Sequence, residues 1–312
     1  MSTKIWMRIV IAATFVTGLA LVALAAAANG GTEPGALVQR ELSGQWTASL
    51  GEDKSKVDLN FERRTAKGGR HQHGHPYDFS ELQGLTREQV SSGGPVKFRI
   101  VREAGTIDCE GSFQNGKGSG TFRFTGSQAF LSAMKSRGFD FEKDSDDEQN
   151  SEDRLFAAAT INVTTALADD LSSAGFGKLQ VEDLFKAAIF KIDSTFMREM
   201  KASGFPNLGM EDLVKARIFK IDAKFVTEAT QMGFDKEPFE SLVKMRIFKV
   251  TPEYIAEVRN EGLSNLSVED AVKLRIFNID TEFIRKAKSE GVPLEVERLV
   301  QKRLGFDHRR AL

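Results

Sequence analysis

The stretch Leu213-Val-Lys-Ala-Arg-Ile-Phe-Lys-Ile-Asp222 returns twice along the chain, as Leu242-Val-Lys-Met-Arg-Ile-Phe-Lys-Val-Thr251 and as Ala271-Val-Lys-Leu-Arg-Ile-Phe-Asn-Ile-Asp280. The copies are 29 residues apart, and a glycine recurs with the same spacing at Gly175, Gly204, Gly233, Gly262 and Gly291. A fixed period of this length is typical of stacked arrays, in which each unit buries its apolar face against the next. The sequence therefore predicts an array and favours binding over catalysis.

Each unit is predicted to contain two short helices. A short polar side chain precedes the first helix and can cap it, at Asp193, Asp222, Thr251 and Asp280. The recurring glycine can end that helix in a left-handed conformation. The second helix begins with acidic residues such as Glu211 and ends with basic ones such as Arg217, which suits the helix dipole. The array is thus expected to be α-solenoid-like.

Before the array, the apolar residues recur with period two, as in Val57, Leu59 and Phe61. This alternation predicts strands with one buried face. The pair Asn115-Gly116 lies between two such runs and favours a tight hairpin. We therefore predict an α+β protein in which an antiparallel β-meander or barrel-like module of five or six strands is followed by the helical array.

The N-terminus reads as a secretory signal peptide. Lys4 and Arg8 precede an apolar run from Ile9 to Leu24, and small residues follow, with cleavage expected after Ala26 or Ala28. An uncleaved membrane anchor is the alternative. The predicted domain organisation is a signal peptide (1–28), the β module (42–126), a first half-repeat with an acidic linker (127–154) and the repeat array (155–312).

Composition excludes several classes of partner and chemistry. The 312 residues carry 43 basic and 44 acidic side chains, so no overall charge attracts nucleic acid. Cys109 is the single cysteine, which rules out an intramolecular disulfide and predicts an inert buried thiol. No cofactor motif is present in the sequence, so no cofactor is expected. Membrane contact is expected only if the N-terminal segment stays uncleaved.

The Gly-Phe and Glu-Asp-Leu-Val-Lys-x-Arg-Ile-Phe units resemble tandem repeats in extracytoplasmic parts of bacterial antirepressor-type M56 membrane metallopeptidases of the beta-lactam-sensor kind. The segment Gly93-Gly-Pro-Val-Lys-Phe-Arg-Ile-Val-Arg-Glu-Ala-Gly-Thr106 looks like the β module that accompanies such repeats. The resemblance covers about residue 42 to the end and implies an exported interaction or sensing region. It carries no catalytic residue, because the chain lacks the His-Glu-x-x-His motif that holds zinc in such a peptidase.

Two sets of residues are candidates for binding. Stacking would align basic residues into rows that fit an acidic partner, with local helix stabilisation as the alternative: Lys215, Arg217, Lys244, Arg246, Lys273 and Arg275. The run His71, His73 and His75 can offer alternate imidazoles to a metal ion, with a solvated glycine-rich loop as the alternative.

A further ladder is apolar, with isoleucine and phenylalanine adjacent in each unit: Ile189-Phe190, Ile218-Phe219, Ile247-Phe248 and Ile276-Phe277. Two adjacent residues of one helix cannot both point inward, so part of the ladder either seals the turn between units or is available to a partner. Packing is the first interpretation.

Together these features predict an exported, non-catalytic scaffold or sensor region that binds a cell-envelope protein through its repeats. In the alternative, the β module is a receptor for a small ligand or a metal, and the repeats are a spacer or an oligomerisation arm. Hydrolysis is the least favoured function, since the sequence offers no nucleophile with its base and no ligand set for a metal.

Overall fold

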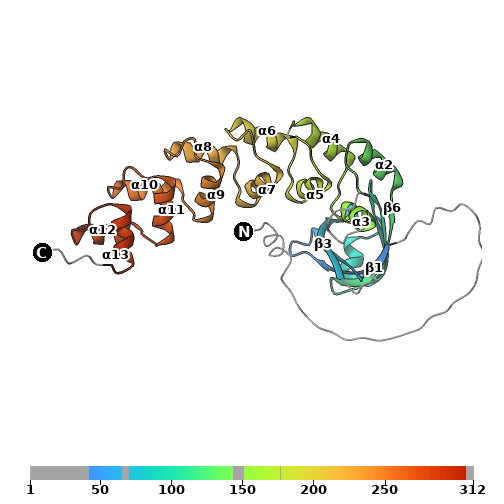
Figure 1. Ribbon diagram of the computed structural model, residues 1–312. Coiled ribbons are helices and arrows are strands. Elements are labelled where there is room, and N and C mark those ends of the chain that lie inside the picture. The colour runs from blue at the N-terminus through green and yellow to red at the C-terminus, as the bar shows by residue number, and fades with distance from the viewer. Residues whose placement is uncertain (1–41, 65–69, 143–150, 176, 307–312) are drawn as a thin grey trace, which may run out of the picture. The chain divides into compact units, whose positions relative to one another are not determined.

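The computed structural model describes residues 42–64, 70–142, 151–175 and 177–306 (Figure 1). All of them belong to one compact unit that begins at Gln39. The predicted signal peptide, residues 1–28, lies outside the described residues, as do residues 143–150 of the acidic linker. In the part of the chain that is described, no helix combines the length and the apolar character that crossing a bilayer requires.

The fold is α+β, as the sequence predicts, and its N-terminal part is a six-stranded antiparallel sheet. The strands are β1 (Leu42–Leu50), β2 (Lys56–Arg64), β3 (Arg70–Asp78), β4 (Gly94–Arg102), β5 (Gly105–Gln114) and β6 (Lys117–Gly126). Their order in the sheet is β3-β2-β1-β6-β5-β4. Two three-stranded meanders are therefore joined where β1 pairs with β6.

The inner face of the sheet is built around Trp46 on β1. The indole is 1% exposed and donates a hydrogen bond of 3.2 Å to the Glu110 carbonyl. Its neighbours on β5 and β6 include Gly111 and Gly120, which lie opposite each other. A Cβ atom on Gly111 would lie 2.6 Å from the indole ring. The absence of a side chain at Gly111 thus leaves the room that the indole ring needs.

The sheet is open, which corrects the barrel-like shape expected from the sequence. β3 and β4 are its edges, and no ladder joins them among the described residues. The connection between the edges holds a short 3-10 helix, η2 (Phe79–Glu81), and α1 (Arg87–Ser92). Within it, Gln83 exchanges two backbone hydrogen bonds of 2.9 Å with Arg99 of β4. This segment occupies backbone groups of β4 that direct pairing with β3 would need.

The hairpin between β5 and β6 confirms the turn predicted from its sequence. Asn115 and Gly116 have φ angles of 51° and 74°. Two-residue hairpin turns of this kind need positive φ at both central residues, which asparagine and glycine tolerate best. The turn fixes the register in which Cys109 lies opposite Phe122.

Two helices follow the sheet, α2 (Gln128–Ser136) and α3 (Ser151–Thr160), and α3 packs against the sheet (Figure 1). Phe156 of α3 is stacked on Phe122, with ring centroids 5.1 Å apart and ring planes 8° apart. The same ring meets Phe61 and Phe124 edge-on. Phe156 thus connects the core of the sheet with α3.

The acidic stretch from Asp140 to Asp153, which falls within the predicted half-repeat and acidic linker (127–154), has buried residues at both of its described ends. Phe141 is buried against Phe130 and Phe185. Asp153 is 6% exposed and forms an ion pair with Arg63 of β2. A buried carboxylate needs such a partner because desolvation of an isolated charge is costly. Both described ends of the stretch therefore pack into the fold, and the linker itself stays a prediction.

The rest of the described chain consists of helical pairs. The first helices are α4 (Thr165–Ser173), α6 (Ser194–Ala202), α8 (Ala223–Gln231), α10 (Pro252–Asn260) and α12 (Thr281–Ser289). The second helices are α5 (Val181–Phe190), α7 (Met210–Phe219), α9 (Phe239–Ile247), α11 (Val268–Ile276) and α13 (Val296–Arg303). Each second helix packs against the next one along the chain, from α5 to α13.

The predicted helix signals are confirmed. Each predicted cap accepts a hydrogen bond from the backbone amide three residues later, at Asp193, Asp222, Thr251 and Asp280. The recurring glycines end the first helices with φ between 69° and 115°. Local chemistry therefore sets where each first helix begins and ends, while contacts between units bury the apolar faces.

Candidate interaction surface

In the second helices α5, α7, α9 and α11, the lysine in the middle of the helix reaches a glutamate of the next unit. The nitrogen-to-oxygen distance is 2.5 Å for Lys186 with Glu211 and for Lys215 with Glu240. Lys244 forms the same pair with Glu269, and Lys273 with Glu297. The hydrogen bond to Glu240 raises the pKa of Lys215. Exposed pairs of this kind contribute little to stability because solvent screens them, so their main effect is to neutralise the lysine row.

The arginine of the second helix connects three helices. Arg217 of α7 donates a hydrogen bond of 2.7 Å to the Lys191 carbonyl at the end of α5. Its guanidinium also lies 3.7 Å from the centroid of the Phe196 ring in α6. Later units keep both contacts: Arg246 with Lys220 and Phe225, Arg275 with Phe248 and Tyr254, and Arg303 with Phe277 and Phe283. Each of these arginines therefore connects its own helix with the first helix of its unit and with the second helix of the preceding unit.

Contacts inside the array thus involve all six cations predicted to bind a partner: Lys215, Arg217, Lys244, Arg246, Lys273 and Arg275. The recurrence of these cations at the array period has a direct physical reason, because each one connects its own helix to a neighbouring unit. Their predicted binding of an external partner stays a prediction.

One aliphatic position is exposed in every unit from α5 onward. The exposed fractions are 56% for Ile189, 50% for Ile218, 48% for Ile247, 48% for Ile276 and 53% for Leu304 of the last unit. We call these five residues the aliphatic ladder. The phenylalanine after each isoleucine is half-buried and packs against the core. The structure thus decides which of the two adjacent apolar residues points outward.

Most other residues that recur in the second helices have contacts within the array. The lysine and glutamate pair with each other, and the arginine contacts two neighbouring helices. The isoleucine or valine after the helix is buried. Burying an isoleucine side chain stabilises a protein by roughly 1.5–3 kcal/mol, and the ladder residues forgo about half of that. The half-exposed isoleucines thus differ from the other recurring residues, whose side chains have their contacts within the array.

A lysine with left-handed backbone conformation lies two residues after each of the first three ladder residues. Lys191, Lys220 and Lys249 have φ between 53° and 54°, and Asn278 takes the fourth place with φ of 50°. The left-handed region is uncommon for a residue with a Cβ atom and costs of order 1–3 kcal/mol, with asparagine tolerating it best. The conformation ends the second helix and leaves the lysine side chain exposed.

The ladder position of the first unit is covered by the sheet. Thr160 of α3 lies 29 residues before Ile189, so it takes the corresponding place. It is buried, and its carbonyl accepts a hydrogen bond of 2.8 Å from the Tyr77 hydroxyl of edge strand β3. The face that is exposed in the later units is therefore an interface in the first one.

The histidine run lies on β3, so the solvated loop expected there is instead an edge strand. His71, His73 and His75 fall on one side of that strand because side chains alternate. The His73 ring lies edge-on to Phe156, with centroids 5.5 Å apart, and the His75 ring lies edge-on to Tyr77. Within the described ranges, no three His, Cys, Asp or Glu side chains are grouped to hold a metal ion. The predicted metal site stays a prediction.

His73 makes stability depend on pH. Burial lowers its pKa, the charges of His71 and Arg63 lower it further, and Asp153 opposes them. The folded state thus favours the neutral imidazole, and its stabilising effect is complete above the unfolded pKa of about 6.5. We expect the free energy of unfolding to fall as pH decreases from 7.5 to 5, and to fall less in His73→Gln. Urea unfolding at each pH measures this, and equal slopes would contradict it.

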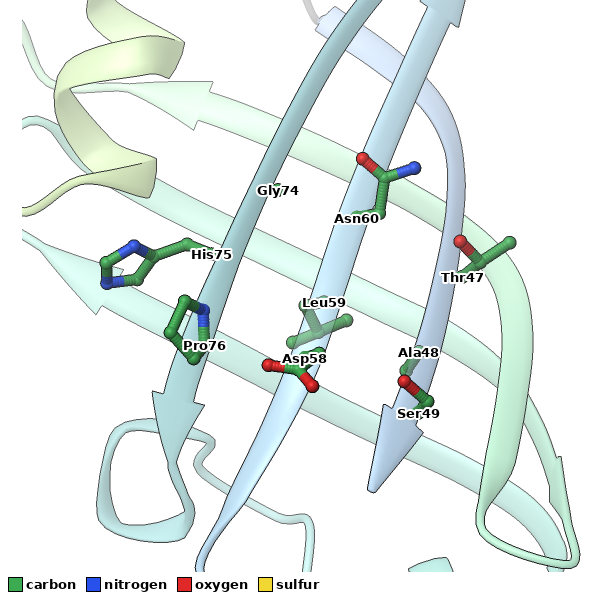
Figure 2. Close-up of a pocket in the computed structure, with 9 residues that line it drawn as sticks. All are labelled: Thr47, Ala48, Ser49, Asp58, Leu59, Asn60, Gly74, His75 and Pro76. Carbon is green, nitrogen blue, oxygen red and sulfur yellow. The ribbon is translucent and has the colours of Figure 1, made fainter. Parts of the chain in front are cut away.

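A shallow depression of about 360 Å³ lies on the solvent face of β1, β2 and β3 (Figure 2). Figure 2 shows Asn60 between Thr47 and Gly74, with Asp58 further along β2, while the His75 ring points away from them. No hydrogen bond links the side chains of Thr47, Asp58 and Asn60 to one another. The depression therefore offers polar groups to a ligand but no assembled nucleophile and base.

Cys109 of β5 is the buried thiol that the sequence predicts. It is free and 1% exposed. Burial raises the pKa of the thiol, and the charge of Asp108 raises it further. A thiol that stays protonated in an apolar environment is a poor nucleophile.

Comparisons with protein-family models, with curated proteins and with solved structures return no match for this chain. The functional argument therefore depends on the surface itself. Two of its features were not predicted individually: the outward position of the isoleucines and the left-handed lysines. Asn162 and Asn278 take the same place in their units as those lysines, and asparagine at a helix end is a known signal for left-handed backbone.

Proposed function

We propose that this protein is an exported, non-catalytic scaffold whose helical pairs form a solenoid-like array that binds another protein of the cell envelope. The observation that carries the proposal is the aliphatic ladder, in which the same position is about half exposed in successive units. Exposed apolar residues in register mark interaction sites more often than isolated ones do. Export is inferred from the N-terminal sequence pattern and from the resemblance to extracytoplasmic repeat regions.

The arginine contacts between units support this proposal. Arg217 and Arg246 each connect an arginine-bearing helix to the end of the preceding second helix. A surface held by such contacts loses little conformational freedom when it binds, which favours affinity. Because the six cations first considered for partner binding are engaged in these contacts, we assign the binding surface to the aliphatic ladder beside them.

The alternative function, in which the β module is a receptor, has weaker support. Trp46, Phe61 and Phe156 fill the inner face of the sheet, where a ligand in the mouth of a barrel would bind. The depression in Figure 2 lies on the opposite, solvent face. Ligand pockets are usually concave and mostly apolar, and this surface is polar and shallow.

Crosslinked affinity capture from a cell-envelope extract tests the proposal. We expect the full chain to retain one protein in stoichiometric amount, and the double variant Ile218→Glu, Ile247→Glu to lose it. The matched control is Val101→Glu, which changes an exposed apolar residue of β4 outside the ladder. Thermal unfolding checks that the variants are folded. Equal capture by the ladder variant and the control would contradict the proposal.

A further inference from the structure

Charged residues border the aliphatic ladder on both sides. On α7, Ile218 follows Glu211 by seven residues and Lys215 by three, so the three side chains lie on one face of the helix. On the other side, Lys220 follows Ile218 by two residues and ends the helix. The other full units repeat this order, with Asn278 in place of lysine in the fourth. The ladder thus runs between a lysine-glutamate row and a row of helix-end residues.

The two rows differ in net charge. In the first row each lysine is paired with a glutamate of the next unit. In the second row Lys220 and Lys249 are exposed, and their side chains form no hydrogen bond or ion pair with the described residues. Lys191, also exposed, contributes a positive charge near His75. The ladder therefore has net positive charge along one side, which complements an acidic partner.

The first row argues for a protein partner over a lipid surface. Its glutamates Glu211, Glu240, Glu269 and Glu297 have 59–64% of their side chains exposed. Because each of them neutralises a lysine, the first row adds no net positive charge to attract the phosphates of an anionic bilayer, and only the helix-end lysines remain. A peptide can place its carboxylates on one side only, beside the helix-end lysines Lys191, Lys220 and Lys249.

The spacing of the ladder favours a helical partner. Ladder residues on neighbouring second helices are separated by one helix packing distance, about 8–10 Å. Residues seven apart on an α-helix are about 10.5 Å apart and lie on the same face. In an extended strand, residues three apart span a similar length but point to opposite faces. A helix with heptad-spaced apolar residues therefore matches the ladder better than a strand does.

The chain itself covers this face in its first unit. There, Thr160 replaces the ladder isoleucine and is buried beneath Tyr77 of β3. The next ladder residue, Ile189, is exposed in the following unit. The open surface is thus the continuation of an interface that already exists within the protein.

We propose that the aliphatic ladder binds an acidic amphipathic helix of the partner protein. Its apolar residues would contact Ile189, Ile218, Ile247 and Ile276, and its carboxylates would lie beside Lys191, Lys220 and Lys249. This inference rests on the proposed scaffold function and adds the chemical class of the partner. Asn278 and Asn162 take the same left-handed conformation without a charge, so the backbone at this position does not require lysine.

Four probes test the inference on the full chain by fluorescence anisotropy or sedimentation. The first is a helical peptide with leucine at every seventh position and glutamates along one side of the row of leucines. The second replaces each glutamate by lysine, and the third replaces each leucine by serine. The fourth is a phosphatidylglycerol vesicle. We expect binding of the first peptide alone.

Three variants of the protein locate the binding face. Ile218→Glu with Ile247→Glu is expected to weaken binding of the first peptide about tenfold or more, since about 1.4 kcal/mol corresponds to tenfold. Lys220→Asn with Lys249→Asn is expected to weaken it about threefold to tenfold, and less at high salt, because screening already removes part of the attraction. Val101→Glu, outside the ladder, should change nothing.

The outcomes separate this inference from the scaffold function. If the basic peptide binds and loses affinity with the ladder variant, the ladder is a binding site but its partner is not acidic. If the vesicle alone binds, the partner class proposed here is wrong. If the peptide fails while envelope capture still depends on Ile218 and Ile247, the scaffold function stands and the acidic-helix inference falls. If capture is also independent of these residues, both fall.

Discussion

Replacing Phe156 by alanine is expected to lower the free energy of unfolding by about 3–5 kcal/mol, the usual cost of truncating a buried phenylalanine. Phe156 is stacked on Phe122 and meets Phe61 and Phe124 edge-on, so its loss leaves a cavity where α3 meets the sheet. Urea unfolding followed by circular dichroism and by Trp46 fluorescence measures the change. We expect the fluorescence transition of the sheet to shift to lower urea.

The matched control is Phe185→Ala, which changes the residue 29 positions later, at the same place of the next unit. Phe185 is half-buried and meets Phe141 edge-on, with centroids 6.0 Å apart. Its truncation should cost clearly less, because fewer contacts are lost and water can fill the space. A larger effect at Phe185 than at Phe156 would show that α3 is not the link between the sheet and the helical units.

Replacing Arg246 by alanine is expected to lower the free energy of unfolding by about 2–4 kcal/mol. The variant loses a charged hydrogen bond to the Lys220 carbonyl and the contact of the guanidinium with the Phe225 ring at 3.7 Å. Such a hydrogen bond contributes about 1.5–3 kcal/mol, and a desolvated cation-π contact up to about 2 kcal/mol. The measurement is the midpoint of thermal unfolding.

Arg246→Lys tests whether charge or shape matters. Lysine keeps the positive charge but cannot present a planar guanidinium to the ring and the carbonyl together. We expect it to recover less than half of the lost stability. Arg285, an exposed arginine paired with Glu261, supplies the control, and Arg285→Ala should leave the midpoint of thermal unfolding nearly unchanged because solvent screens such a pair. Full recovery in Arg246→Lys would mean that the arginine acts only as a charge.

The repeat made the helical part predictable from the sequence. The glycines and the cap residues at Asp193 and Asp222 act through their own backbone, so their effect does not depend on distant contacts. The hairpin at Asn115-Gly116 was predictable for the same reason. The candidate site was harder to predict from the sequence, because both the cations and the isoleucines recur with the array period. The period alone does not say which of them faces solvent.

Sequence patterns by themselves thus determined the helical pairs, their boundaries, the strands and the buried state of Cys109, because these depend on local backbone preference and on alternation of apolar residues. Tertiary structure alone decided that the sheet is open, that Asp153 is buried, that the arginines lock neighbouring helices and that the isoleucines are exposed. Each of these depends on contacts between residues far apart in the chain, and periodicity does not encode which distant groups meet.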